Sequence, residues 1–215
     1  MVSVFELSYF QPPYDQVTFP GKSEEERILY VTREAPVFLG LRLGRFSLAI
    51  AVLLVVGSWL LKQISGVVGW SYGWLVGWWL AVGALVMFGG LWWIWQVYKK
   101  TVFIITTRRL TKFIHTTPWT RYQLSLGLDK VVDSGAYSKG YFQALFGLGT
   151  FVARSSAGNI KNFKIVNIEH AEDLHNWMNK LMFTFNKNVE ELDKFKPFIA
   201  KKKGQRYLGL ETYDG

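Results

Sequence analysis

The sequence has no cysteine, and a long stretch of it has no charge. Without cysteine the chain has no disulfide, no thiolate ligand for a metal and no cysteine nucleophile. Charged residues make up only 19% of the 215 residues, against about one quarter in an average globular protein. The deficit is local, because residues 63–98 carry no charged side chain at all. These absences exclude several kinds of catalytic and metal site and direct attention to one apolar segment.

The uncharged segment is too long to be one membrane-spanning helix. As a single helix it would extend about 54 Å, whereas the hydrocarbon core of a bilayer is about 30 Å thick. Glycine and serine, which are poor helix formers, cluster in residues 65–73 and indicate a turn there. We therefore predict a hairpin of two transmembrane helices, over about residues 37–64 and 73–98.

Aromatic and basic residues gather at the ends of the predicted hairpin. The two aromatic groups resemble the belts of a membrane protein; they are Trp70, Tyr72 and Trp74 at one end and Trp92, Trp93, Trp95 and Tyr98 at the other. Basic residues flank the outer ends of both helices, whereas the connecting loop offers only Lys62. The positive-inside rule therefore predicts a multi-pass protein of the cell membrane with both termini in the cytoplasm. The alternative is a hairpin buried in a soluble core, but a chain of this size has too little other surface to cover it.

Small residues around the second helix are candidates for close helix packing. They are Gly69, Gly73, Gly77 and Gly83. Such residues let transmembrane backbones approach each other, either within one hairpin or between two copies of the chain. We favour packing within the hairpin. Neither predicted helix has an ionisable residue near its middle, which argues against a transporter or a proton relay.

The sequence after the hairpin has the pattern of short strands followed by one helix. β-branched and aromatic runs between turn signals predict an antiparallel sheet or small barrel; the strands are expected over 101–106, 110–115, 119–126, 128–134, 150–155 and 163–167. Helical spacing then follows, in Leu174, Trp177, Met178, Leu181, Met182 and Phe185. We expect Asn167 to cap this helix, which closes the sheet.

The predicted organisation is therefore a membrane protein of mixed α and β structure. An acidic lead-in covers residues 1–36 and contains a strand at 28–33. The helical hairpin covers 37–98, a cytoplasmic domain covers 99–185, and a basic, mixed-charge tail covers 186–215. We expect the tail to be largely solvated, with a segment lying on anionic lipid as the alternative.

Four segments resemble one family in their order and spacing. They are residues 21–40, 102–110 (Val-Phe-Ile-Ile-Thr-Thr-Arg-Arg-Leu), 128–133 (Leu-Asp-Lys-Val-Val-Asp) and 142–149 (Phe-Gln-Ala-Leu-Phe-Gly-Leu-Gly). Together they resemble the bacterial pleckstrin-homology-like (YdbS-like) membrane proteins, over about residues 20–183. Thr107 stands where that family more often has asparagine. The resemblance implies two transmembrane helices followed by a PH-like split β-barrel with a closing helix, and it implies no settled activity.

Residues able to carry catalysis do not form a recognisable pattern. His170 and His175 are five residues apart, whereas metal-binding histidine pairs on a helix are usually four apart. No serine has an evident histidine and aspartate partner. Residues 147–149 lack the third glycine and the Lys-Ser/Thr ending of a phosphate loop, so we expect a turn with positive φ there. We predict no enzyme activity, no metal and no cofactor.

The strongest candidate for function is the basic surface of residues 99–168. This segment holds 11 basic and 2 acidic side chains, enough to account for the net charge of +9. The proposed contacts with anionic lipid are Lys99, Lys100, Arg108, Arg109, Lys130, Lys139 and Arg154, and the same set contains Lys112, Arg121, Lys161 and Lys164. Ordinary solubility charge is an equal alternative. Nucleic acid is not expected, because the adjacent membrane accounts for the basic excess.

These features predict a membrane-anchored, non-enzymatic binding or scaffold protein. Its basic domain would bind a protein partner or anionic lipid at the cytoplasmic leaflet, as a monomer or as a homo-oligomer. The alternative is an accessory subunit of a membrane enzyme or export complex. The lead-in, with a net charge of −3, is expected to pair with the basic domain.

Overall fold

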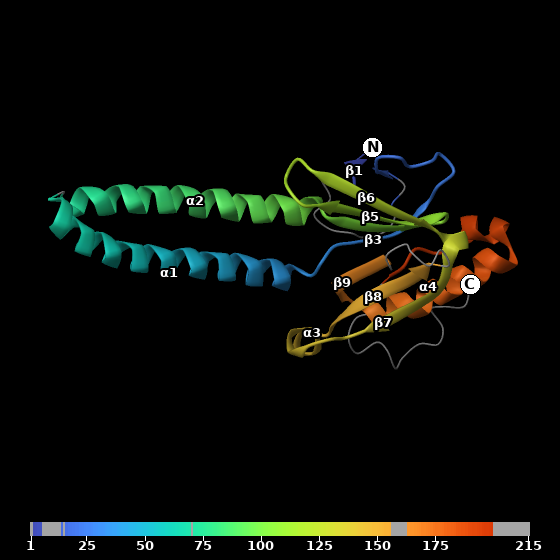
Figure 1. The fold of residues 1–215 in the computed structure, drawn as a ribbon. Coiled ribbons are helices and arrows are strands. Elements are labelled where there is room, and N and C mark those ends of the chain that lie inside the picture. Colours follow the sequence, from blue (N-terminus) through green and yellow to red (C-terminus); the bar gives the residue numbers. More distant parts are fainter. Residues whose placement is uncertain (1, 6–13, 15, 70, 156–162, 200–215) are drawn as a thin grey trace. The chain divides into compact units, whose positions relative to one another are not determined.

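The computed structural model describes residues 2–5, 14, 16–69, 71–155 and 163–199 (Figure 1). The chain divides into two compact units. The helical unit contains Ala35–Thr101 and Ile114–Tyr122, and the sheet unit contains Met1–Glu34, Val102–Phe113 and Gln123–Gly215.

The helical unit is built on two long apolar helices, α1 (Pro36–Val68) and α2 (Tyr72–Lys100). Both are long and apolar enough to cross a membrane. In the most apolar 18-residue stretch of each helix, only 6% is buried. This exposure opposes the alternative of a soluble core hairpin. The predicted hairpin is confirmed, but α1 runs on past residue 64 to Val68. It ends where Gly69 adopts φ 74° and its N–H bonds to the Ser65 carbonyl, a left-handed helix end that glycine favours.

Glycines allow α1 and α2 to pack closely at three levels. A Cβ on Gly57 would overlap the indole ring of Trp79, whose Nε1–H donates to the Leu54 carbonyl at 3.2 Å. A Cβ on Gly83 would likewise overlap the side chain of Leu54. The third level places Gly90 against Phe46. Gly83 thus lies on the side of α2 that faces α1.

The other three predicted packing glycines lie in open space. Among the described residues, nothing outside their own helical turns comes within 4 Å of a Cβ built on Gly69, Gly73 or Gly77. Trp70, expected in one aromatic belt, lies outside the described residues.

Valine at position 57 tests the hairpin packing. We expect Gly57→Val to displace the Trp79 ring, break its hydrogen bond and destabilise the hairpin by about 1–3 kcal/mol. Thermal unfolding of the full chain in detergent micelles measures this, with Gly77→Val as the matched control. An equal shift in both variants would contradict the assigned packing.

The sheet unit contains two antiparallel sheets. The first has the order β3-β4-β5-β6, and the second has the order β7-β8-β9. The strands of the first are β3 (Ile28–Thr32), β4 (Val102–Thr106), β5 (Arg109–His115) and β6 (Arg121–Gly127), and those of the second are β7 (Val131–Tyr137), β8 (Leu148–Ser155) and β9 (Phe163–Glu169). The outer ends of β5 and β6 belong to the helical unit. The strand that was predicted over 128–134 is β7, which begins later, at Val131, because Leu128–Lys130 form a 3-10 helix.

The remaining elements lie outside the two antiparallel sheets and the hairpin. The parallel pair β1 (Val2–Ser3) and β2 (Val17–Thr18) lies in the lead-in. Helix α3 (Tyr141–Phe146), which was not predicted, separates β7 from β8. Helix α4 (Ala171–Lys187) is the predicted closing helix, and a 3-10 segment, Val189–Lys194, follows it.

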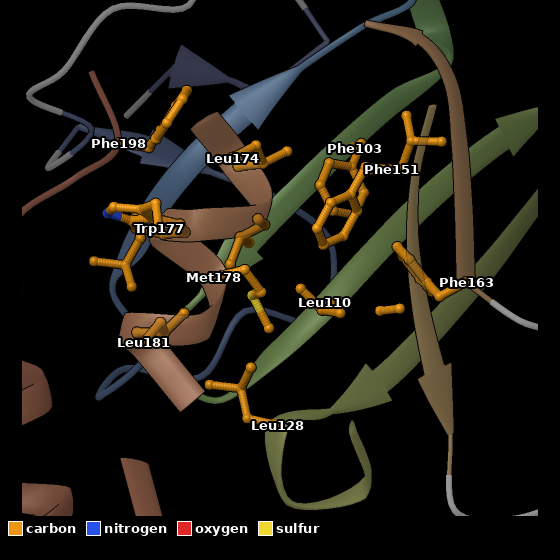
Figure 2. Close-up of a cluster of buried hydrophobic side chains, with 14 of the residues drawn as sticks. Phe103, Leu110, Leu128, Phe151, Phe163, Leu174, Trp177, Met178, Leu181 and Phe198 are labelled. Atoms are coloured by element: carbon orange, nitrogen blue, oxygen red, sulfur yellow. The ribbon is translucent and has the colours of Figure 1, made fainter. Parts of the chain in front are cut away.

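The main hydrophobic core lies between the two sheets and α4 (Figure 2). Phe103, Phe151, Leu174 and Met178 are at most 2% exposed there. A second cluster covers the opposite face of the first sheet, where residues of the lead-in pack on Val102, Ile104 and Phe113. Strand β4 is therefore buried along its whole length, which explains why it is apolar without alternation.

Asn167 does not cap α4, contrary to the prediction. Strand β9 continues to Glu169, and the cap position is taken by His170, with φ 54°. Asn167 has φ 60° and lies where the register between β8 and β9 shifts by one residue. This bulge lets Ile165 and Ile168, three residues apart, both point into the core.

The predicted tail begins as part of the folded domain. Leu192 and Phe198 are each 3% exposed, and the Phe198 N–H donates to the Leu29 carbonyl at 3.0 Å. The Phe198 ring also contacts Tyr30 and Trp177, with centroids 4.9 and 5.7 Å away. The domain therefore reaches at least to Phe198, whereas residues 200–215 lie outside the described residues.

Candidate functional site

Helix α3 has the reverse of the usual polarity for a surface helix. Its four large apolar side chains are exposed, namely Tyr141 (76%), Phe142 (51%), Leu145 (61%) and Phe146 (46%). Its buried side chain is the polar Gln143. Exposed apolar groups gathered on one element mark contact surfaces more often than scattered ones do.

Gln143 holds α3 in this orientation through a buried polar network. Its Oε1 accepts the Lys139 N–H at 2.7 Å, and its Nε2 donates to Thr150 Oγ1 at 3.2 Å and to Asn167 Oδ1 at 2.7 Å. Asn167 Nδ2 in turn donates to Glu34 Oε1 at 2.6 Å. Because the side chain of Gln143 finds its partners inside, the apolar residues of α3 are turned to the outside.

Gly147 ends α3 with φ 64°, as expected for a turn glycine in residues 147–149. Its N–H bonds back to the Ala144 carbonyl, so the helix stops after six residues and the chain enters β8. Gly149 lies within β8 and has no positive φ.

A cavity of about 350 Å³ opens beside α3. Its walls come from α3, from the adjoining ends of β7, β8 and β9, and from the start of α4. Phe146 supplies apolar lining, and Glu169, His170 and Glu172 supply the ionisable groups. The site therefore combines an apolar rim with two carboxylates.

A serine, a histidine and an asparagine meet elsewhere in the domain. Ser134 Oγ lies 2.8 Å from His175 Nδ1 and donates to Asn179 Oδ1 at 2.9 Å, while Asn179 Nδ2 lies 3.2 Å from His175 Nε2. Ser134 is only 4% exposed and lies outside the cavity walls. A nucleophile must reach its substrate, so we assign the cluster a structural role that joins β7 to α4.

The described residues do not gather the histidines into a group large enough to hold a metal. No group of three or more His, Asp or Glu side chains able to hold a metal occurs in the described part of the chain. His170 Nδ1 lies 3.5 Å from Asp173 Oδ2. His175 belongs to the Ser134 cluster.

Arg108 and Arg109, predicted as lipid contacts, bind the lead-in. Arg109 forms a bidentate pair with Glu26, with Nε–Oε1 and Nη2–Oε2 distances of 2.9 Å each. Arg108 pairs with Glu25, and both of those side chains are largely exposed. These ion pairs join the acidic lead-in to the basic domain, as its opposite charge had suggested.

Glu26 is a buried hydrogen-bond centre that sequence reasoning missed. Its side chain is 1% exposed and also accepts the Thr106 hydroxyl at 2.6 Å and the Ser23 N–H at 3.2 Å. Burial by itself raises the pKa of Glu26, but the hydrogen bonds from Arg109, Thr106 and Ser23 lower that pKa below its ordinary value. We therefore assign Arg109 to folding and leave it out of the proposed lipid contacts.

The remaining basic candidates are spread over several elements. Lys130 is exposed in the 3-10 turn and Lys139 is exposed just before α3. Arg154 lies 3.6 Å from Asp133, with both side chains more than half exposed. Lys112 Nζ donates to the Lys164 carbonyl at 2.8 Å, and burial lowers the pKa of Lys112 although Glu34 opposes this. Lys161 lies outside the described residues.

Lys99 and Lys100 end α2 and belong to the helical unit. Lys99 Nζ lies over the Trp95 ring, 4.9 Å from its centroid. Lys100 Nζ donates to the Pro118 carbonyl at 2.9 Å. Both therefore lie among aromatic residues at the end of an apolar helix, as interfacial basic residues do.

Residues 35–182 match the bacterial PH domain family, and this range covers well over half of the chain. The chain belongs to that family. The PH domain match includes α1, α2 and most of α4, so the resemblance expected from the sequence is confirmed. Neither a search of curated proteins nor one of solved structures gave a match. The match identifies no catalytic family, and it names no ligand for the PH domain.

Proposed function

We propose that this PH domain protein is a membrane-anchored, non-enzymatic binding module that holds a protein partner on α3. The reversed polarity of α3 carries the proposal, because the buried Gln143 network turns four large apolar side chains outward. Exposure of these apolar side chains to water is unfavourable in free energy, and a partner that covers them removes this unfavourable exposure. Helices α1 and α2 would anchor the protein in the cell membrane.

The pairing of β3 with β4 supports an even number of membrane crossings. β3 precedes α1 and β4 follows α2, yet the two strands are directly paired from Ile28↔Thr106 to Thr32↔Phe103. This pairing supports the proposal that α1 and α2 cross the membrane in opposite directions, with both ends of the hairpin on one side. The lysines at the end of α2 favour the cytoplasmic side.

The carboxylates that line the cavity beside α3 favour a protein partner over an anionic lipid surface. Glu169 and Glu172 line the cavity, and carboxylates repel anionic headgroups. The same carboxylates attract lysine or arginine. We therefore expect a partner segment in which apolar side chains cover α3 and an adjacent basic residue reaches the cavity.

Site-specific photo-crosslinking in native membranes tests this. A benzophenone amino acid at position 142 is expected to give one discrete protein adduct whose crosslinked peptide has apolar and basic residues side by side. The same probe at Phe183, an equally apolar and 67% exposed position on α4, is the control and should give none. Replacing Tyr141 and Leu145 by alanine should cost about 2 kcal/mol or more, roughly a thirtyfold loss of binding.

Reversal of charge separates specific from non-specific adducts. Glu169→Lys combined with Glu172→Gln should also reduce the adduct, because it removes the attraction for the basic residue. An adduct insensitive to both sets of changes, or crosslinking to lipid alone, would overturn the proposal. Crosslinks to a component of a membrane enzyme or export complex would identify the protein as an accessory subunit, and crosslinks between copies would identify a homo-oligomer.

A further inference from the structure

The loop between β5 and β6 folds against α2 within the helical unit. The Trp119 ring lies 5.4 Å from the Trp93 ring in an edge-to-face arrangement, and Lys100 binds the Pro118 carbonyl. Trp119 is nevertheless 76% exposed. We infer that residues 116–120 form a membrane-contact loop that places Trp119 in the lipid headgroup region where α2 leaves the bilayer. The inference rests on the membrane anchor of the proposed function and is independent of the partner on α3.

The position of Trp93 along α2 sets the depth of this loop. Trp74 and Trp93 are nineteen residues apart, about 28 Å along a helix, which is close to the thickness of the hydrocarbon core. If Trp74 lies at one boundary of that core, Trp93 lies at the other. Trp119 contacts Trp93 and so lies at the same boundary. Indole rings prefer this depth, because they are apolar with one polar N–H.

Several backbone groups of the loop have hydrogen-bond partners within the protein. Thr117 Oγ1 accepts the N–H groups of Trp119 and Thr120, at 3.3 and 2.8 Å. The Thr116 N–H donates to the Thr120 carbonyl at 3.3 Å, and Pro118 has no N–H. The Pro118 carbonyl is bound to Lys100, so these groups do not depend on water, which favours placing the loop tip against lipid.

Basic and aromatic side chains around the loop fit a lipid surface. Lys99 and Lys100 lie on the α2 side, and Arg121 and Tyr122 are exposed at the start of β6. Burial lowers the pKa of His115, Lys100 and Arg121 lower it further, and a hydrogen bond with the Lys100 backbone opposes this. We therefore expect no acid-dependent release of the loop near neutral pH. We favour a lipid surface over a protein as the partner of the loop. The loop contacts the aromatic end of α2, which places it at the same level as the membrane boundary of that helix.

Fluorescent labels at single cysteines test the depth, and the cysteine-free chain needs no prior substitution for this. The full protein carries an environment-sensitive label at Trp119→Cys, in vesicles of phosphatidylcholine and phosphatidylglycerol. Nitroxide lipids quench it from the headgroup end or from the chain end. Leu85→Cys, a 74% exposed mid-helix position, provides the deep standard, and Trp92→Cys provides the boundary standard. Thr120→Cys repeats the measurement with Trp119 in place.

The label at Trp119 should resemble the one at Trp92. We expect shallow nitroxides to quench it about twofold more than deep ones, with the reverse order at Leu85. The loop contact alone would be overturned if iodide quenched the labels at positions 119 and 120 as strongly as a free dye while the label at position 85 stayed protected. Absence of nitroxide quenching at Leu85 would overturn the membrane anchor and the loop together. The crosslinking at α3 is a separate readout, so the two proposals can fail separately.

Discussion

Phe151→Ala is expected to lower the free energy of unfolding of the sheet unit by about 3–5 kcal/mol. Phe151 is 0% exposed and belongs to the core between the two sheets and α4 (Figure 2). It lies on β8, which is paired with a strand on each side and so cannot easily shift to fill the space that the ring leaves. The loss thus combines the transfer of an aromatic side chain from water with a cavity that does not collapse.

Hydrogen exchange of the full chain in nanodiscs measures this loss at the amides of β7, β8 and β9. Phe183→Ala is the matched control, because it removes the same side chain from a position 67% exposed on α4. That control should change protection by no more than about 0.5 kcal/mol. Equal effects of the two substitutions would show that Phe151 is not a core residue.

The second large effect is expected at Glu26. Glu26→Ala removes a carboxylate that is 1% exposed and leaves Arg109 and Thr106 without their shared acceptor. Breaking a buried ion pair commonly costs about 3–5 kcal/mol. Arg109 is 27% exposed and can recover some hydration, so we expect the lower part of that range. Thermal unfolding in nanodiscs should show a fall of roughly 5–10 °C.

Acid should produce the same loss in the unchanged protein. The pKa of Glu26 is lowered in the folded state, so its contribution is complete above the unfolded pKa of about 4.3. It is lost as the pH falls through the lower folded value. The Glu26→Ala variant should therefore lose less stability than the unchanged protein over that acidic range.

Glu25→Ala provides the control in the neighbouring residue. Glu25 pairs with Arg108, and their side chains are 77% and 54% exposed. An exposed pair of this kind contributes at most about 1 kcal/mol. If Glu25→Ala lowered the stability as much as Glu26→Ala, the loss would be due to the net charge of the lead-in and not to the buried hydrogen bonds of Glu26.

The hairpin and most strands could be predicted because the relevant signals are local. The absence of charge over residues 63–98 and the length limit of a bilayer require two helices. The first helix was predicted to end at residue 64, whereas α1 ends at Val68, and this error also has a local cause. Ser65 and Gly66 are poor helix formers, but propensity is weak beside the hydrogen bonding of a helix already formed.

The candidate site could not be predicted because its signals are not local. The residues of α3 lack a polar face, and the side that turns outward depends on the partners of Gln143, two of which lie in β8 and β9. Two glycines, Gly140 and Gly147, bracket the helix and were an available sign that it exists. Glu26 likewise depends on Arg109, 83 residues away along the chain. Asn167 was misassigned because an asparagine followed by acids resembles a helix cap, whereas pairing with β8 makes it a bulge.

The pairing of β3 with β4 also sets an order of events during synthesis. Thr32 leaves the ribosome well before Val102, and with the proposed membrane anchor the segment between them enters the membrane first. At about 5–20 residues per second, β3 waits roughly 4–14 s for its neighbour. During that time Leu29 and Val31, which are buried in the finished protein, have no partner strand. Newly made chains should therefore depend on chaperones until α2 has been inserted and β4 has emerged.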